Sequence, residues 1–441
     1  MNMRLHDGPL AGLETDALAW PLANGPSLGQ AADERVAALR ESGEMHGKPG
    51  ELTLLHEPKG LQSRRLMLMG VGDSLDATQV FRMAGQAVRA AQKRRFKRLA
   101  IALPDGEFVR VAAEGCVYGS YEQPKYKSDD SNLPLEEILI VAPGADSAAF
   151  DAGRIVGESV NLTRRLVDIP ANDLGPVEFA DMAESVGQAA GLDVEVLDEA
   201  GLEALGAGSL LSVAKGSARP PRLVRLAWNP ADAVGDSHLF LVGKGVTFDT
   251  GGLSLKPAGS MEKMKYDMAG AATMLGAITA IARLGVKQRV SCLLGLVENM
   301  PSGTATRPGD IVQAMNGKTI EVINTDAEGR MVLADALTYA VRLGATHLVD
   351  AATLTGAVSV ALGAVNIGLL GNDDSLSAHL TATGQTIGEH FWSLPMNDDY
   401  LEPMKGDLSD LRNAGTDRKA GTITAAKLDR KSTRLKSSHH S

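Results

Sequence analysis

The chain has 441 residues, of which 44% are apolar and 22% charged, and its formal net charge is −10. This balance is typical of a globular protein, and it argues against a strongly basic nucleic-acid binder or a protein held on an anionic membrane surface. The length predicts about two or three domains with a large core. The chain has two cysteines, Cys116 and Cys292, which favours a reducing compartment over a fold stapled by disulfides.

The N-terminal stretch lacks the apolar region of a signal peptide. No segment contains the roughly 18 uninterrupted apolar residues of a transmembrane helix. We therefore expect a cytoplasmic protein with no membrane partner.

Residues 1–60 show little periodicity, and alternating elements are predicted after them. Apolar runs at Arg65–Val71, Lys97–Leu103 and Glu137–Val141 are typical of strands, and the spacing at Asp76–Arg95 and Ser147–Val167 is helical. Strands that alternate with helices predict βαβ units and a parallel sheet.

A segment rich in turn residues, Asp168–Pro176, marks the start of a second alternating series. The predicted strands of this series are Asp193–Leu197, Leu223–Trp228, Leu239–Val242, Val290–Val297, His347–Ala351 and Val365–Leu370, and its predicted helices are Val177–Ala190, Asp267–Leu284 and Met331–Leu343. Several of these strands are apolar on both faces, as expected when helices cover both sides of a sheet. We predict an α/β protein of two domains, a smaller one at 1–165 and a larger one at 166–426 with a mixed, mostly parallel sheet covered by helices.

Residues 427–441 differ in composition from the rest of the chain. They carry five Lys or Arg residues and no apolar period. A disordered basic tail is one interpretation. We favour another, that the segment resembles translated adaptor sequence rather than evolved protein.

Charged side chains gather in three Gly-rich segments that lie where predicted strands end or helices begin. Val242–Pro257 holds Lys244, Asp249 and Lys256, Met264–Gly270 holds Asp267, and Asn324–Arg330 holds Asp326, Glu328 and Arg330. Functional groups of open α/β sheets collect at such places.

The four acidic residues of these segments would repel one another at a shared site. Two divalent cations would cancel their charge of −4, and cations about 3.5–4 Å apart are a known arrangement for hydrolysing acyl or phosphoryl bonds. Oxygen ligands suit Mg²⁺ or Mn²⁺, and Zn²⁺ in dinuclear sites. In extended backbone, Asp326, Glu328 and Arg330 would project to one side.

Each of these residues also has an ordinary structural interpretation. Thr325 and Glu328 have the spacing of a capping box, and Asp267 could cap a helix. Taken singly, Lys244 and Lys256 would be solvated surface lysines. Two nucleophile motifs lack their context: Gly25–Gly29 fits G-x-S-x-G without a preceding strand, and Ser260–Lys263 fits S-x-x-K without its partner motifs.

Residues 240–360 resemble the catalytic core of the leucyl aminopeptidase family, the cytosol aminopeptidases, in its bacterial form. The heptapeptide NTDAEGR at 324–330 is the family signature, and VGKGVTFDTGG, MKYDMAGAA, ENMPSG, RPGD and DAATLTGA stand in the family's order. The resemblance extends backward through NLTRRLVDIPAN at 161–172. It implies a metallopeptidase that releases leucine and other mainly apolar N-terminal residues from peptides, with two Mn²⁺ or Zn²⁺ ions per subunit.

The resemblance also implies a role for each site residue. Lys244, Asp249, Asp267, Asp326 and Glu328 match the metal ligands, with Asp249 and Glu328 bridging both ions. A ligating Lys244 must be neutral, so its pKa would fall from about 10.4, and two adjacent dications supply the cause. Lys256 matches the lysine that polarises the scissile carbonyl, and Arg330 matches the arginine that holds a bicarbonate general base. Met264, Thr353 and Gly356 match positions that line the pocket for the first side chain, and the carbonyl of Leu354 matches a substrate contact.

The resemblance further implies a homohexamer, with a macro-like N-terminal domain that serves assembly and shields the active site. The family continues for several tens of residues where this chain has its tail, so the chain resembles a family member truncated at its C-terminus. We expect such a chain to be less stable and less active. An alternative from another class is a DNA- or nucleotide-binding architectural protein of the same fold, in which the basic run Gln92–Arg98 would contact phosphate. The net charge of −10 argues against a nucleic-acid partner.

Overall fold

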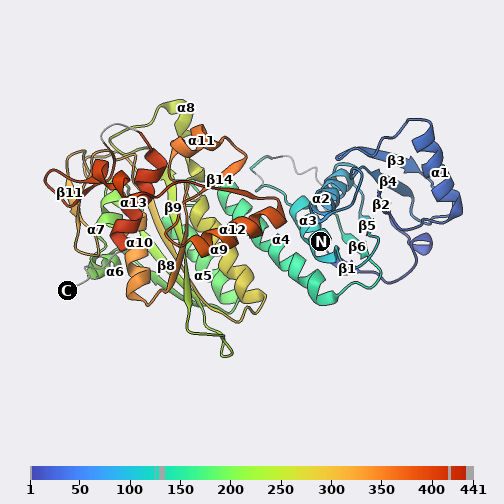
Figure 1. Cartoon of the computed structure of the whole chain (residues 1–441), viewed down its shortest axis with the longest axis horizontal. Coiled ribbons are helices and arrows are strands. Elements are labelled where there is room, and N and C mark those ends of the chain that lie inside the picture. Colours follow the sequence, from blue (N-terminus) through green and yellow to red (C-terminus); the bar gives the residue numbers. More distant parts are fainter. Residues whose placement is uncertain (1, 125, 129–134, 416–418, 434–441) are drawn as a thin grey trace. The chain divides into compact units, whose positions relative to one another are not determined.

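A computed structural model describes residues 2–124, 126–128, 135–415 and 419–433 (Figure 1). The chain divides into two compact units, Met1–Asn161 and Leu162–Ser441. The division falls inside helix α4 (Ser147–Asp168), and the boundary predicted between residues 165 and 166 lies in the same helix. No described helix is both long enough and apolar enough to cross a membrane.

The first unit is built on a six-stranded sheet with the order β1-β6-β5-β2-β4-β3. Its strands are β1 (Asn2–Leu5), β2 (Ala17–Pro21), β3 (Leu52–His56), β4 (Arg65–Met69), β5 (Arg98–Ala102) and β6 (Glu137–Val141). Neighbouring strands pair in parallel, except that the edge strand β3 runs antiparallel to β4. The parallel sheet predicted from the alternating pattern is therefore present, and it includes β1, β2 and β3 from the segment that showed little periodicity.

Helices cover both faces of this sheet. Alternate residues of β4 separate its two cores: Met67 and Met69 pack with α2 (Ala77–Lys93) and α3 (Val109–Gly119), and Leu66 and Leu68 pack with α1 (Gln30–Glu41). Helices α2 and α3 approach so closely that a Cβ added at Gly119 would lie 2.5 Å from the Gly85 carbonyl oxygen. Small residues are needed there because a side chain would force the two helices apart.

The second unit is built on a five-stranded sheet with the order β13-β9-β10-β8-β7. Its strands are β7 (Asp193–Leu197), β8 (Arg222–Trp228), β9 (His238–Asp249), β10 (Arg289–Asn299) and β13 (His347–Ala351). Strands β13, β9 and β10 run parallel to one another, and β8 runs antiparallel to β10 and β7. The predicted mixed sheet is confirmed.

Helices also cover both faces of this sheet (Figure 1). On β9, Leu241 packs in the core formed with α5 (Pro176–Ala189) and α9 (Ala269–Arg283), and Phe240 and Val242 pack in the core formed with α7 (Gly208–Ala214) and α10 (Gly329–Arg342). A strand with both faces buried reads as a continuous apolar run, which is how β9 and β10 appear in the sequence.

The second unit also contains smaller elements. They are α6 (Glu199–Leu205), α8 (Ala258–Met261), η2 (Met264–Tyr266), α11 (Gly356–Leu362), α12 (Asp374–Ile387), η3 (Asp398–Met404), a three-stranded sheet of β11 (Ile311–Gln313), β12 (Thr319–Glu321) and β16 (Leu411–Arg412), and the parallel pair β14 (Asn366–Leu369) and β15 (His390–Ser393).

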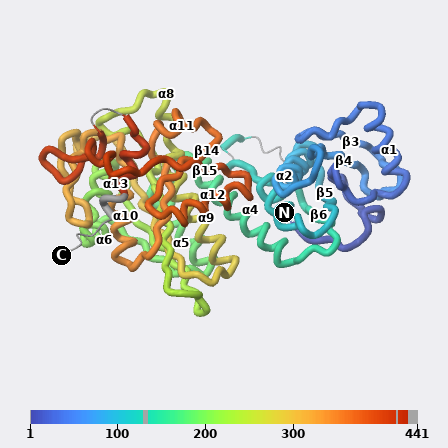
Figure 2. The backbone as a smooth tube through the Cα atoms, viewed as in Figure 1, coloured from blue at the N-terminus to red at the C-terminus, as the bar shows by residue number. Residues whose placement is uncertain are grey.

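The last described element, α13 (Gly421–Thr433), packs against α10 (Figures 1 and 2). The tail predicted from residue 427 therefore begins inside this helix. Lys427 and Leu428 are fully buried, and the Lys427 ammonium donates to the Met396 carbonyl at 2.5 Å and pairs with Asp398 at 3.0 Å. Burial of its aliphatic stem and a partnered ammonium explain how a basic residue can lie in this helix. Residues 434–441 of the predicted tail lie outside the described residues.

Candidate active site and metal centre

The candidate site begins where the three parallel strands of the second unit end. Asp249 is the last residue of β9, Asn299 is the last residue of β10, and Thr353 follows β13 by two residues. Asp249 and Asn299 are register partners across β9 and β10, beyond an irregularity at Val297. The parallel direction of the strands therefore delivers these three side chains to one edge of the sheet.

The remaining acidic residues come from loops that precede helices. Asp267 lies between η2 and α9, and Asp326 and Glu328 lie between β12 and α10. Carboxylate oxygens of Asp249, Asp326 and Glu328 all lie within 4.8 Å of one another. Side chains more than 70 residues apart in the chain thus meet at one point.

The prediction of extended backbone at residues 326–330 is wrong. The Ala327 amide donates to the Asn324 carbonyl at 3.1 Å and closes a turn, and Glu328 has φ −79° and ψ −35°, which is helical. Arg330 already belongs to α10. The turn, rather than strand alternation, brings the carboxylates of Asp326 and Glu328 together.

The capping interpretations do not match the structure. The Thr325 hydroxyl donates to the Gly251 carbonyl at 2.6 Å and accepts from the Ser254 amide at 2.8 Å, so it joins two loops rather than capping α10. Glu328 is the N-cap residue of α10, and its side chain makes no capping bond. The N-cap of α9 is Met268 rather than Asp267. These carboxylates are therefore directed at the site and not at helix ends.

Lys244 lies inside the cluster and is 1% exposed. Its ammonium lies 2.6 Å from Asp267 Oδ1 and 2.9 Å from Glu328 Oε1, and it donates to the Thr353 carbonyl at 2.9 Å. Burial favours the neutral amine, but the charges of Asp267 and Glu328 outweigh it and raise the pKa of Lys244. The lowered pKa predicted for a ligating Lys244 thus requires adjacent dications, because the protein's own groups shift the pKa in the opposite direction.

The glycine of the NTDAEGR signature has a steric reason. A Cβ added at Gly329 would lie 2.5 Å from Lys244 Cε. A larger residue there would push the lysine side chain away from Asp267 and Glu328. The signature therefore supplies two acidic residues, one arginine and a glycine that leaves room for the Lys244 side chain.

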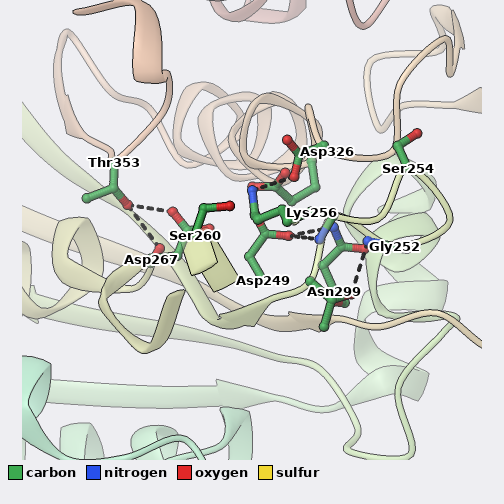
Figure 3. A network of polar contacts seen from close by, with 12 residues as sticks. Asp249, Gly252, Ser254, Lys256, Ser260, Asp267, Asn299, Asp326 and Thr353 are labelled. Atoms are coloured by element: carbon green, nitrogen blue, oxygen red, sulfur yellow. Dashed lines mark hydrogen bonds and ion pairs between the residues drawn. The ribbon is translucent and has the colours of Figure 1, made fainter. Parts of the chain in front are cut away.

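Lys256 joins the other two carboxylates (Figure 3). Its ammonium lies 2.7 Å from Asp249 Oδ2 and also pairs with Asp326. Burial opposes the charged amine, but the two carboxylates raise the pKa of Lys256. The side chain is 16% exposed, against 2% for Lys244, so Lys256 is the lysine that can reach a molecule in the cavity.

Asp267 and Asp249 are held by neutral donors as well. The Thr353 hydroxyl donates to Asp267 Oδ1 at 2.8 Å, and the Asn299 amide donates to Asp249 Oδ1 at 2.8 Å (Figure 3). Burial raises the pKa of Asp267, and the charges of Glu328 and Asp249 add to it against Lys244. Among the described residues, no side chain or backbone group hydrogen-bonds the buried Asp267 Oδ2.

The donor set fits divalent cations. Four carboxylates and two lysines leave a formal charge of −2 in a cluster of which Asp249, Asp267, Glu328 and Lys244 are buried, and an unsatisfied carboxylate oxygen adds a desolvation cost of about 1–3 kcal/mol or more. Carboxylate oxygens are ligands for Mn²⁺, Mg²⁺ and Zn²⁺. The residues that would hold such cations are Lys244, Asp249, Asp267, Asp326 and Glu328.

Arg330 lies beside this cluster and is 7% exposed. Its Nη1 donates to the Asn413 carbonyl at 2.8 Å, and its Nε is buried with no hydrogen-bond acceptor among the described residues. Burial lowers the pKa of Arg330 against the opposing charges of Asp429 and Glu328. A buried guanidinium with an unused donor is suited to holding an oxyanion.

The structure brings all the predicted site residues to one cavity of about 2350 Å³. Met264 begins η2, Leu354 follows β13, and Gly356 begins α11, and these three residues line the same cavity as the acids, the lysines and Arg330. Sequence reasoning missed three supporting residues, Asn299, Thr325 and Asn413. The position of Asn299 at a strand end was the available signal, whereas the sequence around Asn413 offered none.

Comparison with known proteins identifies what this fold and site belong to. Residues 161–436 match the catalytic domain of the cytosol aminopeptidase family, and residues 12–130 match the N-terminal domain of that family. Together with the acidic cluster at the ends of parallel strands, these matches define an α/β peptidase, a hydrolase of peptide bonds. The chain belongs to the cytosol aminopeptidase family, as its motifs predicted.

Relatives cover nearly the whole chain. A probable cytosol aminopeptidase of Solibacter usitatus is 48% identical over 435 residues, which is 97% of this chain and 89% of the relative. One of Acidobacterium capsulatum is 42% identical over 457 residues, which is 97% of this chain and 90% of the relative. A solved structure described as "Bottromycin maturation enzyme BotP in complex with Mn" has a TM-score of 0.85 and 36% identity, covering 96% of this chain and 90% of that chain. The two-domain fold is confirmed, and the chain is an aminopeptidase of a metal-dependent family that acts on peptides.

Proposed function

We propose that this aminopeptidase releases N-terminal leucine and other mainly apolar residues at a centre of two divalent cations, Mn²⁺ or Zn²⁺. The observation that supports this most is the convergence of four carboxylates and two lysines on one cavity. Bound there, the cations would supply a hydroxide nucleophile at neutral pH and polarise the scissile carbonyl. The Mn in the description of the BotP structure makes Mn²⁺ the first cation to test.

Asp267 would select substrates that have a free N-terminal amine. Its buried Oδ2 is unsatisfied among the described residues, and the Thr353 hydroxyl fixes its other oxygen. An ammonium or amine placed against Oδ2 would satisfy that oxygen. A peptide whose N-terminus is blocked could not do so, which restricts the enzyme to exopeptidase activity.

Lys256 and Arg330 would be the two side chains that take part in catalysis besides the metal ligands. The Lys256 ammonium faces the cavity and would stabilise the oxyanion that develops on the scissile carbonyl. Arg330 would hold a bicarbonate ion through its unused Nε, and that ion would carry a proton to the leaving amine. Met264, Thr353 and Gly356 would line the pocket of the first side chain, and the Leu354 carbonyl would accept a hydrogen bond from the substrate.

We further propose a cytoplasmic homohexamer, on the strength of the family resemblance. Sedimentation equilibrium of the purified chain should give six times the mass of 46.2 kDa. A monomer mass at micromolar protein would contradict the hexamer and leave the chemistry of the site untouched.

The proposed function is tested with a panel of aminoacyl amides. We expect leucine amide and methionine amide to be cleaved, N-acetyl-leucine amide to be resistant, and all cleavage to stop after treatment with a chelator and return with Mn²⁺. Cleavage that persists in the metal-free enzyme would refute the metal centre. Equal cleavage of the acetylated substrate would refute the role of Asp267.

A further inference from the structure

We propose that Asn413 is a positioning residue for the metal centre, because its side-chain amide fixes the loop that carries Asp326 and Glu328. The inference rests on the proposed role of those two residues as metal ligands. Asn413 is fully buried and lies more than 80 residues after the loop that it holds.

The position of Asn413 follows from the small three-stranded sheet. Strand β16 pairs in parallel with β12, and the backbone amide of Asn413 extends this pairing by donating to the Glu321 carbonyl at 3.0 Å. Val322 still bonds to Gly309 and Asp310 on the β11 side of the sheet. From Ile323 onward the chain turns toward α10, and its peptide groups bond to the side chain of Asn413 instead of to a strand.

The side-chain amide of Asn413 bonds to the backbone of the ligand loop, as a neighbouring strand would. Its Oδ1 accepts from the backbone amides of Ile323 at 2.8 Å and Asn324 at 3.2 Å. Its Nδ2 donates to the carbonyls of Asn324 at 2.7 Å and Ala327 at 3.3 Å. These four contacts use both donors and both acceptor positions of the amide. Alanine at this position would remove all four bonds and leave the carbonyl of the buried Ala327 without this partner.

The bonded peptide groups bracket the proposed ligands. Ala327 lies between Asp326 and Glu328, so a shift of its carbonyl moves both carboxylates. The backbone carbonyl of Asn413 also accepts from Arg330 Nη1 at 2.8 Å, which ties the same residue to the first turn of α10. On the opposite side, Thr325 joins the loop to Gly251 and Ser254. The ligand loop is thus held from two sides, and Asn413 supplies one of them.

Support of this kind is measurable as metal affinity. Partners that orient metal ligands typically change metal affinity or activity 10- to 100-fold when they are removed. A purely structural side chain would lower the melting temperature and leave the affinity of the folded protein for metal unchanged. The two roles are separated by measuring both quantities in the same variants.

Asp335 provides a matched structural control. Its buried carboxylate accepts from the backbone amides of Leu210 at 2.9 Å and Met315 at 2.7 Å, so it also holds two distant segments, the first turn of α7 and the loop after β11, but no hydrogen bond among the described residues joins it to the ligand loop. Asp335→Ala should lower the melting temperature without changing Mn²⁺ affinity. It reports how much a general loosening of the unit affects the site.

The experiment measures Mn²⁺ dissociation constants, melting temperatures and leucine amide kinetics for the full chain and for the variants Asn413→Ala, Asn413→Ser and Asp335→Ala. We expect the Asn413→Ala dissociation constant for Mn²⁺ to rise 10- to 100-fold and kcat to stay below that of the unsubstituted chain at saturating Mn²⁺. Asn413→Ser keeps one hydrogen-bonding group and should give a smaller change, and it serves as the test if Asn413→Ala does not fold.

Two results would overturn the inference: unchanged Mn²⁺ affinity in a folded Asn413 variant, or equal weakening by Asp335→Ala at a similar melting temperature. Failure of the unsubstituted chain to bind Mn²⁺ would instead overturn the proposed function itself.

Discussion

Replacement of Lys256 by methionine tests the proposed chemistry most directly. Methionine keeps much of the length and packing of the side chain and removes the ammonium group that lies 2.7 Å from Asp249 Oδ2. If Lys256 stabilises the oxyanion, its interaction exists mainly in the transition state. Lys256→Met should therefore lower kcat and leave KM nearly unchanged.

The magnitude follows from the surroundings of the ammonium. The Lys256 side chain is 16% exposed, so its charge acts in a largely desolvated site. Loss of one oxyanion donor in such a site costs about 2.7–4 kcal/mol, which is a fall of about 10²–10³ in kcat. At an effective dielectric constant near 20, a unit charge about 4 Å from an oxyanion contributes about 4 kcal/mol, which is consistent with that range.

The charge balance of the cluster separates loss of chemistry from loss of metal. Four carboxylates and two lysines sum to −2, and Lys256→Met leaves −3, so a dication should bind at least as tightly in the variant. The assay is leucine amide hydrolysis at saturating Mn²⁺, with metal content measured by elemental analysis on the same samples. Lys263→Met is the control, because Lys263 lines the same cavity but is exposed.

A kcat of Lys256→Met within threefold of the unsubstituted enzyme, at equal metal content, would refute the oxyanion role. A fall in kcat that tracks a loss of metal would also refute it, because Lys256 would then act through the ligands.

Three further predictions concern the ligands and the amine site. Asp326→Ala should lower the bound metal below two ions per subunit. The control Asp310→Ala removes an acid that pairs with Arg307 and should leave the metal content unchanged. Two ions retained in Asp326→Ala by elemental analysis would exclude Asp326 as a ligand. Thr353→Val removes the hydroxyl that donates to Asp267 Oδ1 and should raise the KM for leucine amide about 10- to 100-fold, since hydrogen bonds to charged groups contribute about 1.5–3 kcal/mol. An unchanged KM would argue that Asp267 does not bind the amine. Mn²⁺ at 100 times its dissociation constant should stabilise the fold by about 2.7 kcal/mol and raise the melting temperature of the second unit by about 5 °C, and scanning calorimetry should show no such rise in Glu328→Gln.

Burial alone did not decide which strands the sequence predicted, because the fully buried β2 was missed and the partly exposed edge strands β7 and β13 were found. Strands β6, β7 and β13 match the predicted ranges. Strand β6 is a buried apolar run in a parallel sheet, whereas β7 pairs antiparallel with β8 and alternates polar with apolar residues. Helix α1 was missed because its apolar positions are few, with Ala32, Val36 and Leu39 as its buried residues. Strands β12 and β16 are too short to show a period, and their pairing joins residues about 90 positions apart.

The acids and lysines of the site could be named from the sequence, but their geometry could not. Composition showed charged residues in Gly-rich loops, and only the resemblance to a family chose metal binding over helix capping. The turn at Asn324–Ala327 could not be derived, because it depends on Asn413 and Thr325, whose bonds reach distant segments. Side chains that support a site have no motif when their partners are peptide groups.

The pairing of lysines with acids explains how the fold tolerates its own acidic centre. Lys244 joins Asp267 to Glu328, and Lys256 joins Asp249 to Asp326, so each ammonium bridges one pair of carboxylates. A cation that binds between Asp249 and Asp326 must compete with the Lys256 ammonium, and a cation that Lys244 ligates must first displace a proton from that lysine. The lysines therefore weaken metal binding. They also reduce the formal charge of the metal-free site from −4 to −2, which stabilises the folded chain. Lysines placed within an acidic centre therefore exchange metal affinity for stability of the protein, which is why Lys256→Met should lose catalytic rate without losing metal.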